Sequence, residues 1–204
     1  MAKAVGVADT EGLSAVTMRR VATALGSGTM SLYTYVSERD ALLELMIDAV
    51  IGEQELPTAT GDWHADLAAF ARTQRALMRR HPWLPVALTG RRTMGPHTLR
   101  ALDHALALLA PSGLPHQSRL EAFALISGFV ASHVGHETAQ HQALGRTGDP
   151  RQFAESNARY LSGAVASGAY PHLAEALAAN GAEPAPDPDV TFERLLARVI
   201  SGLA

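Results

Sequence analysis

The stretch Thr17–Asp40, TMRRVATALGSGTMSLYTYVSERD, indicates how the amino-terminal part of this chain folds. Thr17 is suited to begin a helix, because its hydroxyl can accept a hydrogen bond from a backbone N–H of the first turn. The apolar residues that follow recur at helical spacing, and Gly26 is suited to end that helix. A second short helix is expected from about Gly28 to Tyr35. Two such helices joined by a glycine turn predict a helix-turn-helix, a motif whose second helix enters the major groove of DNA.

Helical signals extend to both sides of this stretch. A helix is expected from about Met1 to Glu11, because Gly12 can adopt the backbone conformation that ends helices. On the other side, Ser37 and Asp40 have the spacing of a capping box. They predict a fourth helix that begins close to Ser37 and carries an apolar face.

The segment 56–61, LPTATG, has the composition of a turn and divides the chain. We therefore predict a helix-turn-helix domain over residues 1–55 and a second domain over residues 62–204. Apolar residues continue to recur at three and four, and no run alternates as a strand does, so the predicted fold class is all-α. Further helices are expected at Asp62–Arg80, Trp83–Leu88, His97–Ala110, Pro115–Leu144, Gln152–Ser167, His172–Asn180 and Thr191–Leu203.

The composition narrows the function classes. Hydrophobic residues make up 47% of the 204 residues and charged residues 18%, which is typical of a folded protein with a sizeable core. The chain has no cysteine, so thiol catalysis, disulfides and thiolate metal sites are excluded. No signal peptide or membrane-spanning run is visible, so we expect a cytoplasmic protein that does not associate with a membrane. We expect no cofactor.

The charge of the first 52 residues argues against nucleic-acid binding. The net charge of the whole chain is -3, whereas phosphate contacts from Lys and Arg supply much of the affinity for DNA. The first 52 residues contain four cations against six carboxylates, the cations being Lys3, Arg19, Arg20 and Arg39. Any DNA contact must therefore come from a small local surface.

The 24 residues of Thr17–Asp40 resemble the DNA-binding motif of the tetracycline repressor (TetR) family. Spacing, turn residues and apolar positions all agree with the family pattern, which falls here on Thr17, Ala22, Gly26, Leu32, Tyr33, Tyr35, Arg39 and Leu42. Tyr35 replaces the usual histidine and Arg39 the usual lysine, and both keep a hydrogen-bond donor. The segments 62–84 and 192–203 are similar to the start of the effector domain and to the dimer helix of the same family.

The resemblance implies a ligand-responsive transcriptional repressor, not an enzyme, that binds double-stranded operator DNA as a homodimer. It would release its palindromic operator on binding a small, largely apolar effector. Base edges would be read by hydroxyls on the second helix and by a cation, namely Thr29, Ser31, Thr34 and Arg19. Phosphates would be held by Thr17, Tyr33, Tyr35 and Arg39. The alternative for the two tyrosines is that they pack the small domain beside Leu32 and Val36.

The family's effector domain surrounds an apolar cavity, and ligand pockets are in general apolar with a few fixed polar groups. The residues of this chain that fit such a lining are Phe70, Gln74, Met78, Leu102, Phe123, Ser127 and His133. For each of them, ordinary core packing is the alternative. Where tetracycline-binding members carry a histidine shortly before a Gly-Thr-Arg turn, this chain has Ala87, which disfavours a magnesium–tetracycline ligand.

Two other classes of function stay open. His133, His136, Glu137 and His141 lie close together on one predicted helix, as in a zinc site. The histidines do not have the HExxH spacing of metalloproteases, and a solvated or interface face is the better interpretation, so no metal is expected. The third class is a helical dimer without DNA binding, which the acidic balance favours.

Dimerisation is expected through the segments Pro115–Leu144 and Thr191–Leu203. The second carries an apolar stripe formed by Phe192, Leu195, Leu196, Val199, Ile200 and Leu203. This stripe is wider than one neighbouring helix would cover, and a large exposed apolar patch is rare on a soluble monomer. A four-helix bundle between two copies would bury it.

Overall fold

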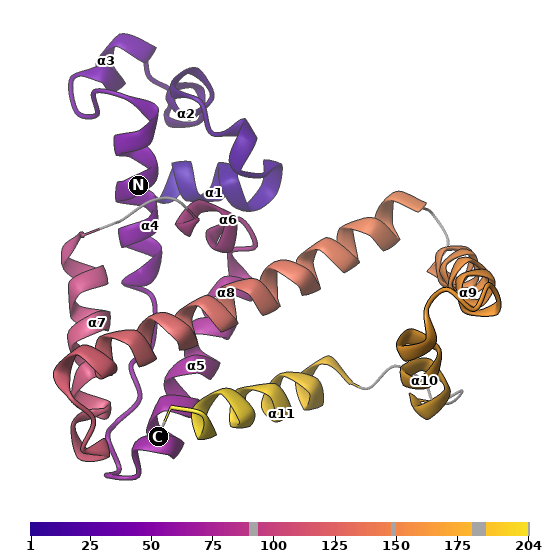
Figure 1. The fold of residues 1–204 in the computed structure, drawn as a ribbon. Helices are drawn as coiled ribbons and strands as arrows, with labels where there is room; N and C mark the ends of the chain where they lie inside the picture. The colour runs from indigo at the N-terminus through magenta and orange to yellow at the C-terminus, as the bar shows by residue number, and fades with distance from the viewer. Residues whose placement is uncertain (90–93, 148–149, 181–186, 204) are drawn as a thin grey trace. The chain divides into compact units, whose positions relative to one another are not determined.

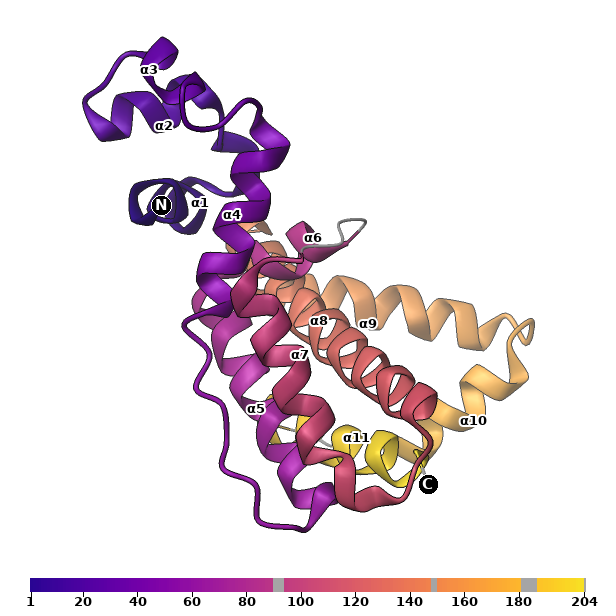
Figure 2. The same cartoon turned by 90° about the vertical axis from the view of Figure 1, so that its left-hand side faces the viewer.

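The computed structural model describes residues 1–89, 94–147, 150–180 and 187–203. Every regular element in these ranges is helical, so the predicted all-α class is confirmed (Figures 1 and 2). The chain forms two compact units, one of residues 1–135 with 193–204 and one of residues 136–192. The predicted domain division after residue 55 stays a prediction. No described helix is long and apolar enough to cross a membrane.

The first four α-helices form the amino-terminal part of the larger unit, which we call the head. They are α1 (Ala2–Glu11), α2 (Met18–Leu25), α3 (Thr29–Tyr33) and α4 (Arg39–Ile51), with the short 3-10 helix η1 (Leu13–Ala15) between α1 and α2. In Figures 1 and 2, α1, α2 and α3 gather around the amino-terminal half of α4. The helix-turn-helix arrangement expected from the sequence is therefore present as a local structure.

The ends of α2 follow the predicted capping chemistry. The Thr17 hydroxyl accepts a hydrogen bond from the Arg20 backbone N–H at 3.1 Å, which satisfies one of the free donors of the first turn. Gly26 ends the helix in the left-handed conformation with φ 66°, which a residue without Cβ adopts at little cost. The predicted capping box at the start of α4 is wrong. This helix begins at Arg39 after Glu38, and no side chain caps it.

The larger unit continues with α5 (Trp63–Arg80), α6 (Leu84–Leu88), α7 (Pro96–Leu108), the 3-10 helix η2 (Ala110–Ser112), the first part of α8 (His116–Thr147) and the last part of α11 (Pro188–Ser201). The smaller unit contains α9 (Pro150–Ala166) and α10 (Pro171–Asn180). The connections from α6 to α7 and from α10 to α11 include residues 90–93 and 181–186, which lie outside the described residues.

The segment 56–61 is fixed onto the start of α5 by a buried carboxylate. Asp66, which is 2% exposed, accepts hydrogen bonds from the Thr60 hydroxyl at 2.7 Å, from the Thr60 backbone N–H at 3.0 Å and from the Gly61 backbone N–H at 3.2 Å. These bonds, first among them the one from the Thr60 hydroxyl, hold the pKa of Asp66 below its ordinary value. The predicted turn is thus an ordered connection.

The apolar stripe of α11 is divided between the interior and the surface. Phe192, Leu196 and Ile200, spaced by four residues, are at most 4% exposed within a single chain. Leu195 and Val199 are half-buried. The stripe is therefore narrower than the sequence suggested, because one side of it belongs to the core of the protomer.

Candidate functional site

The outer face of the head is polar and aromatic around α3. Ser31 and Thr34 are exposed, Thr29 is half-buried, and the side chains of Tyr33 and Tyr35 are 45% and 83% exposed. Both tyrosines thus point away from the core, unlike Leu32 and Val36, which are 9% and 8% exposed as expected. The structure brings these five predicted DNA-binding residues of the α3 region together on one short segment.

The cations of the head have different environments. Arg19 is exposed on α2. Arg20 forms an ion pair with Glu11, which lowers the pKa of that carboxyl chiefly through the hydrogen bonds and raises the pKa of Arg20. Arg39 is half-buried, and its guanidinium donates to the backbone carbonyl of Val16 at 2.7 Å and to that of Leu13 at 3.0 Å. Arg39 therefore ties the start of α4 to the turn before α2.

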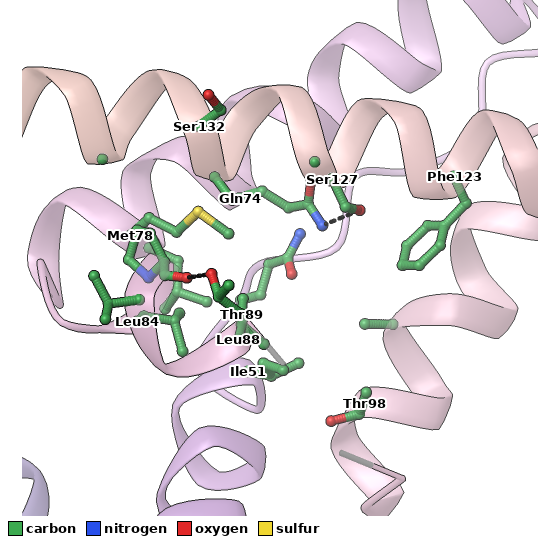
Figure 3. Close-up of a pocket in the computed structure, with 18 residues that line it drawn as sticks. Ile51, Gln74, Met78, Leu84, Leu88, Thr89, Thr98, Phe123, Ser127 and Ser132 are labelled. Carbon is green, nitrogen blue, oxygen red and sulfur yellow. Dashed lines mark hydrogen bonds between the residues drawn. The ribbon is translucent and has the colours of Figure 1, made fainter. Parts of the chain in front are cut away.

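A cavity of about 630 Å³ lies in the larger unit, among α5, α6, α7, α8 and the end of α4 (Figure 3). Its volume is within the range of ligand-binding pockets, ~300 to 1,000 Å³. The described residues that line it are Ile51, Gln54, Gln74, Leu77, Met78, Leu84, Pro85, Val86, Leu88, Thr89, Thr98, Ala101, Phe123, Ser127, Gly128, Ala131, Ser132 and Gly135. None of these side chains is ionisable.

The cavity contains four of the seven residues that the sequence proposed, namely Gln74, Met78, Phe123 and Ser127. Gln74 Nε2 donates to Ser127 Oγ at 3.1 Å, a contact between residues 53 positions apart. Figure 3 shows this pair between Met78 and Phe123. Leu102 and His133 do not line the cavity, and neither does Phe70, which packs with Ala105 and Leu108 in the core. The ligand-binding role of all seven residues stays a prediction.

Sequence reasoning missed two walls of the cavity. One is the end of α4, which contributes Ile51 and the nearby Gln54. The other is the segment Leu84–Thr89, which holds α6. Gln54 is buried in the structure, but the sequence shows only a polar residue after an apolar helix, which is ordinary at a helix end. The position of α6 had no local signal, since its sequence does not indicate against which helix it folds.

The α4 helix connects the other helices of the head to this cavity. It begins at Arg39, which is bonded to the turn before α2, and ends at Ile51, in the cavity wall. Asp48, one turn before Ile51, is 8% exposed and accepts hydrogen bonds from the backbone N–H and the hydroxyl of Thr98, both at 2.9 Å. Thr98 itself lines the cavity. Contacts inside the cavity therefore reach α4 directly through Ile51 and indirectly through Asp48.

The histidines of α8 do not assemble into a metal site. His141 Nδ1 lies 2.8 Å from the backbone carbonyl of Glu137, and His136 Nε2 lies 2.9 Å from Gln140 Nε2. The ring of His133 is next to Phe129, with centroids 5.8 Å apart. Among the described residues, no three histidine, aspartate or glutamate side chains come together as ligands of a metal ion.

Comparisons with known proteins point to one family. Residues 56–204 match the family model described as "Tetracyclin repressor-like, C-terminal domain". The chain is 41% identical over 174 residues to the HTH-type transcriptional repressor DrrR1 of Streptomyces coeruleorubidus. That match covers 84% of this chain and 64% of the relative, so the chain spans less than two thirds of it. A second relative, an HTH-type transcriptional regulator of Saccharopolyspora erythraea, is 32% identical over 203 residues. That match covers 98% of this chain and 81% of the relative.

Solved structures give the same result for nearly the whole chain. The chain resembles the Streptomyces coelicolor TetR family protein ActR in complex with actinorhodin, with a TM-score of 0.81 and 29% identity. That match covers 99% of this chain and 92% of the other. ActR without ligand gives a TM-score of 0.79 with 30% identity over 99% of this chain and 91% of the other. Their similarity spans the head and the cavity alike.

Proposed function

Because the chain belongs to the TetR family of transcriptional regulators, we propose that it is a homodimeric repressor that releases a palindromic operator when a small, largely apolar effector fills the cavity. The observation that carries the proposal is the course of α4. One end of this helix holds the head through Arg39, and the other end forms part of the cavity wall at Ile51. A single helix thus extends from the turn before α2 to the cavity wall.

The DNA-reading surface is the exposed face around α3. Hydroxyls serve as donors or acceptors, so Thr29, Ser31 and Thr34 read base edges, and Arg19 reaches guanine. Tyr33 and Tyr35 donate to phosphates and so fix the register without reading the sequence.

Thr17 and Arg39 keep donors for phosphate contacts after their internal bonds are counted. The Thr17 hydroxyl accepts from the Arg20 backbone, which leaves its own proton free to be donated. Arg39 uses two of the five N–H groups of a guanidinium on the carbonyls of Val16 and Leu13. Both residues therefore combine a structural role with a contact to the DNA backbone.

Release of the operator by the effector follows from the geometry of the two heads in a dimer. In a dimer on DNA, the two recognition helices must meet major grooves about one helical turn, ~34 Å, apart. A ligand that displaces Ile51 or Thr98 displaces α4, and the other helices of the head move with α4 because Arg39 bonds it to the turn before α2. A small rotation of each head spoils the spacing. The ligand then favours the protein conformation that binds the operator weakly. By linkage, operator binding lowers the affinity for the ligand by the same factor.

The dimer interface is formed by the exposed apolar faces of α8 and α11. On α8, Leu120 and Leu125 are 41% and 58% exposed. On α11, Leu195 and Val199 are half-buried and flank the buried row of Phe192, Leu196 and Ile200. Full burial of an exposed side chain of this size is worth ~1.5 to 3 kcal/mol, so each of these partly exposed side chains stabilises the dimer by a fraction of that.

A small-molecule effector is supported by the cavity and by a relative. ActR, to which the chain is similar over almost its whole length, is described in complex with actinorhodin. The apolar lining with few polar groups has the general character of a ligand site. None of the described lining residues is ionisable, which argues in the same direction as Ala87, against a metal-bound anionic ligand.

A mobility-shift titration tests the proposed function. The duplex is the promoter region next to the gene for this protein, with an unrelated duplex of equal length as competitor. A specific complex that weakens with added salt supports the repressor, because phosphate contacts release counterions. Equal affinity for both duplexes at every salt concentration contradicts it and favours a helical dimer without operator binding.

A further inference from the structure

The cavity lining offers one buried acceptor that no described donor satisfies. Gln74 is 9% exposed, and its Nε2 donates to Ser127 Oγ. Its Oε1 is buried and receives no hydrogen bond from the residues that the structure describes. A buried carbonyl oxygen without a donor is costly, and such groups are usually satisfied by protein, water or ligand. Gln74 Oε1 therefore marks the position where a donor from a bound molecule is favoured.

The threonine hydroxyls of the lining are already used within the protein. Thr89 Oγ1 donates to the backbone carbonyl of Pro85 at 3.2 Å, and Thr98 Oγ1 donates to Asp48 Oδ1 at 2.9 Å. The dashed lines in Figure 3 show the Thr89–Pro85 and Gln74–Ser127 bonds. Gln74 Oε1 is thus the one polar atom among the described lining side chains that is both buried and without a partner.

Charge and size complete the description of the ligand. An ion that entered this cavity would lose part of its hydration without meeting an opposite charge, since no described lining residue is ionisable, and such a transfer is unfavourable. An apolar cavity of ~150 Å³ is known to hold benzene, whereas this one measures about 630 Å³. The cavity has room for a molecule of several fused rings.

We infer that the cavity selects an uncharged, multi-ring ligand that donates a hydrogen bond, from a hydroxyl or an N–H, to Gln74 Oε1. This inference rests on the proposed function only in taking the cavity as the effector site. Gln74 is then a specificity-determining residue, held in place by Ser127. The ligand's rings contact Met78, Phe123 and the α6 wall, and its donor replaces the missing partner of the amide oxygen.

Three pyrene derivatives of nearly equal shape test the inference by fluorescence titration of the purified protein in the absence of DNA. 1-Hydroxypyrene carries a donor, 1-methoxypyrene carries only an acceptor, and pyrene-1-sulfonate carries a charge. Near neutral pH the phenol is uncharged. We expect 1-hydroxypyrene to bind roughly three- to ten-fold more tightly than the methyl ether, the size of a single net hydrogen bond. The sulfonate should bind more weakly than either.

Two variants test whether Gln74 causes the preference for the phenol over the ether. Gln74→Leu removes the acceptor and should abolish the preference for the phenol over the ether, while both still bind. Thr89→Val is the matched control, because it removes a lining hydroxyl that is already bonded to Pro85, and it should keep the preference. Circular dichroism checks that both variants remain helical.

Several results would overturn the inference. They are equal affinity for phenol and ether, tighter binding of the ether or the sulfonate, no saturable binding of any probe, and a preference that survives Gln74→Leu. Because no DNA is present, each of these outcomes is separate from the question whether the protein binds an operator. If the protein prefers the phenol but binds no operator, only the proposed function is contradicted.

Discussion

Asp9 Oδ1 lies 2.8 Å from His81 Nδ1, although the two residues are 72 positions apart in the sequence. The same carboxylate oxygen accepts a hydrogen bond from Trp83 Nε1 at 2.7 Å, and His81 Nε2 lies 3.1 Å from Glu53 Oε2. Asp9 thus connects α1 of the head to the turn between α5 and α6, directly before the α6 wall of the cavity.

Removing this carboxylate should destabilise the fold. Asp9→Ala leaves the buried Trp83 Nε1 without its acceptor, so we expect the free energy of unfolding in urea to fall by ~1 to 3 kcal/mol. In a double-mutant cycle with Trp83→Phe, the two losses should not add, because they break the same bond. Glu44→Ala, at an exposed position of α4, serves as the control. Additive losses would show that the Asp9–Trp83 bond does not form in solution.

The Asp66 carboxylate should make stability depend on pH in the acid range. Its pKa is lowered in the folded state, chiefly by the Thr60 hydroxyl. The stabilisation is therefore present above the pKa of the unfolded chain, ~4, and is lost as the pH falls through the lower pKa of the folded state. Asp66→Asn should be less stable than the wild type at neutral pH.

Urea unfolding between neutral pH and about pH 3 measures this effect, and the difference between wild type and Asp66→Asn should shrink as the pH falls below ~4. Thr60→Val removes the largest cause of the pKa shift and should weaken the pH dependence. A difference between wild type and Asp66→Asn that stays constant over the whole range would contradict the assignment.

Gly95 should not tolerate a side chain. A Cβ at this position would lie 2.2 Å from the carboxylate of Asp48, which is buried and bonded to Thr98. Gly95→Ala must displace this carboxylate, and overpacking of this kind costs ~1 to 3 kcal/mol. Gly6→Ala is the matched control, since nothing lies within 4 Å of its Cβ and α1 is a helix. Thermal unfolding should show opposite shifts, down for Gly95→Ala and up for Gly6→Ala.

The sequence predicted the local structure of the head well, because capping and turn chemistry act between near neighbours. The bond from the Arg20 backbone to Thr17 and the left-handed Gly26 are examples. The sequence did not predict which helices pack against one another. Phe70 and Gln74 are four residues apart on α5, yet Phe70 packs with Ala105 in the core and only Gln74 lines the cavity. A periodic pattern identifies an apolar face, but the rotation of that face toward the core or the cavity depends on the other helices.

Substitutions that test the dimer interface must not fall on the core residues of α11. Leu196 is 1% exposed within one chain, so changing it tests folding as much as association. Leu125→Asp combined with Val199→Asp instead places charges at one exposed and one half-buried position. We expect light scattering to show a dimer for the wild type at micromolar concentration and a monomer of unchanged helicity for the double variant. A wild-type monomer, or a double variant that stays dimeric, would show that the interface lies elsewhere.

Two substitutions on the head separate phosphate contacts from base reading. Tyr33→Phe removes only a hydroxyl, and it should weaken binding to the operator and to unrelated DNA by a similar factor. Thr34→Ala should instead change the preferred base at one position in each half-site, at ~1 to 3 kcal/mol of discrimination. Fluorescence anisotropy with operator variants measures both. A Tyr33→Phe effect restricted to the operator would contradict the phosphate assignment.

Selection from a pool of random duplexes at low salt tests the central claim most directly, because it needs no knowledge of the operator. The wild-type protein should enrich an inverted repeat whose half-sites are centred about one helical turn, ~10 base pairs, apart or a multiple of that distance. Adding the molecule that fills the cavity should abolish the enrichment. If the protein enriches no sequence over the starting pool, it is not the repressor proposed here.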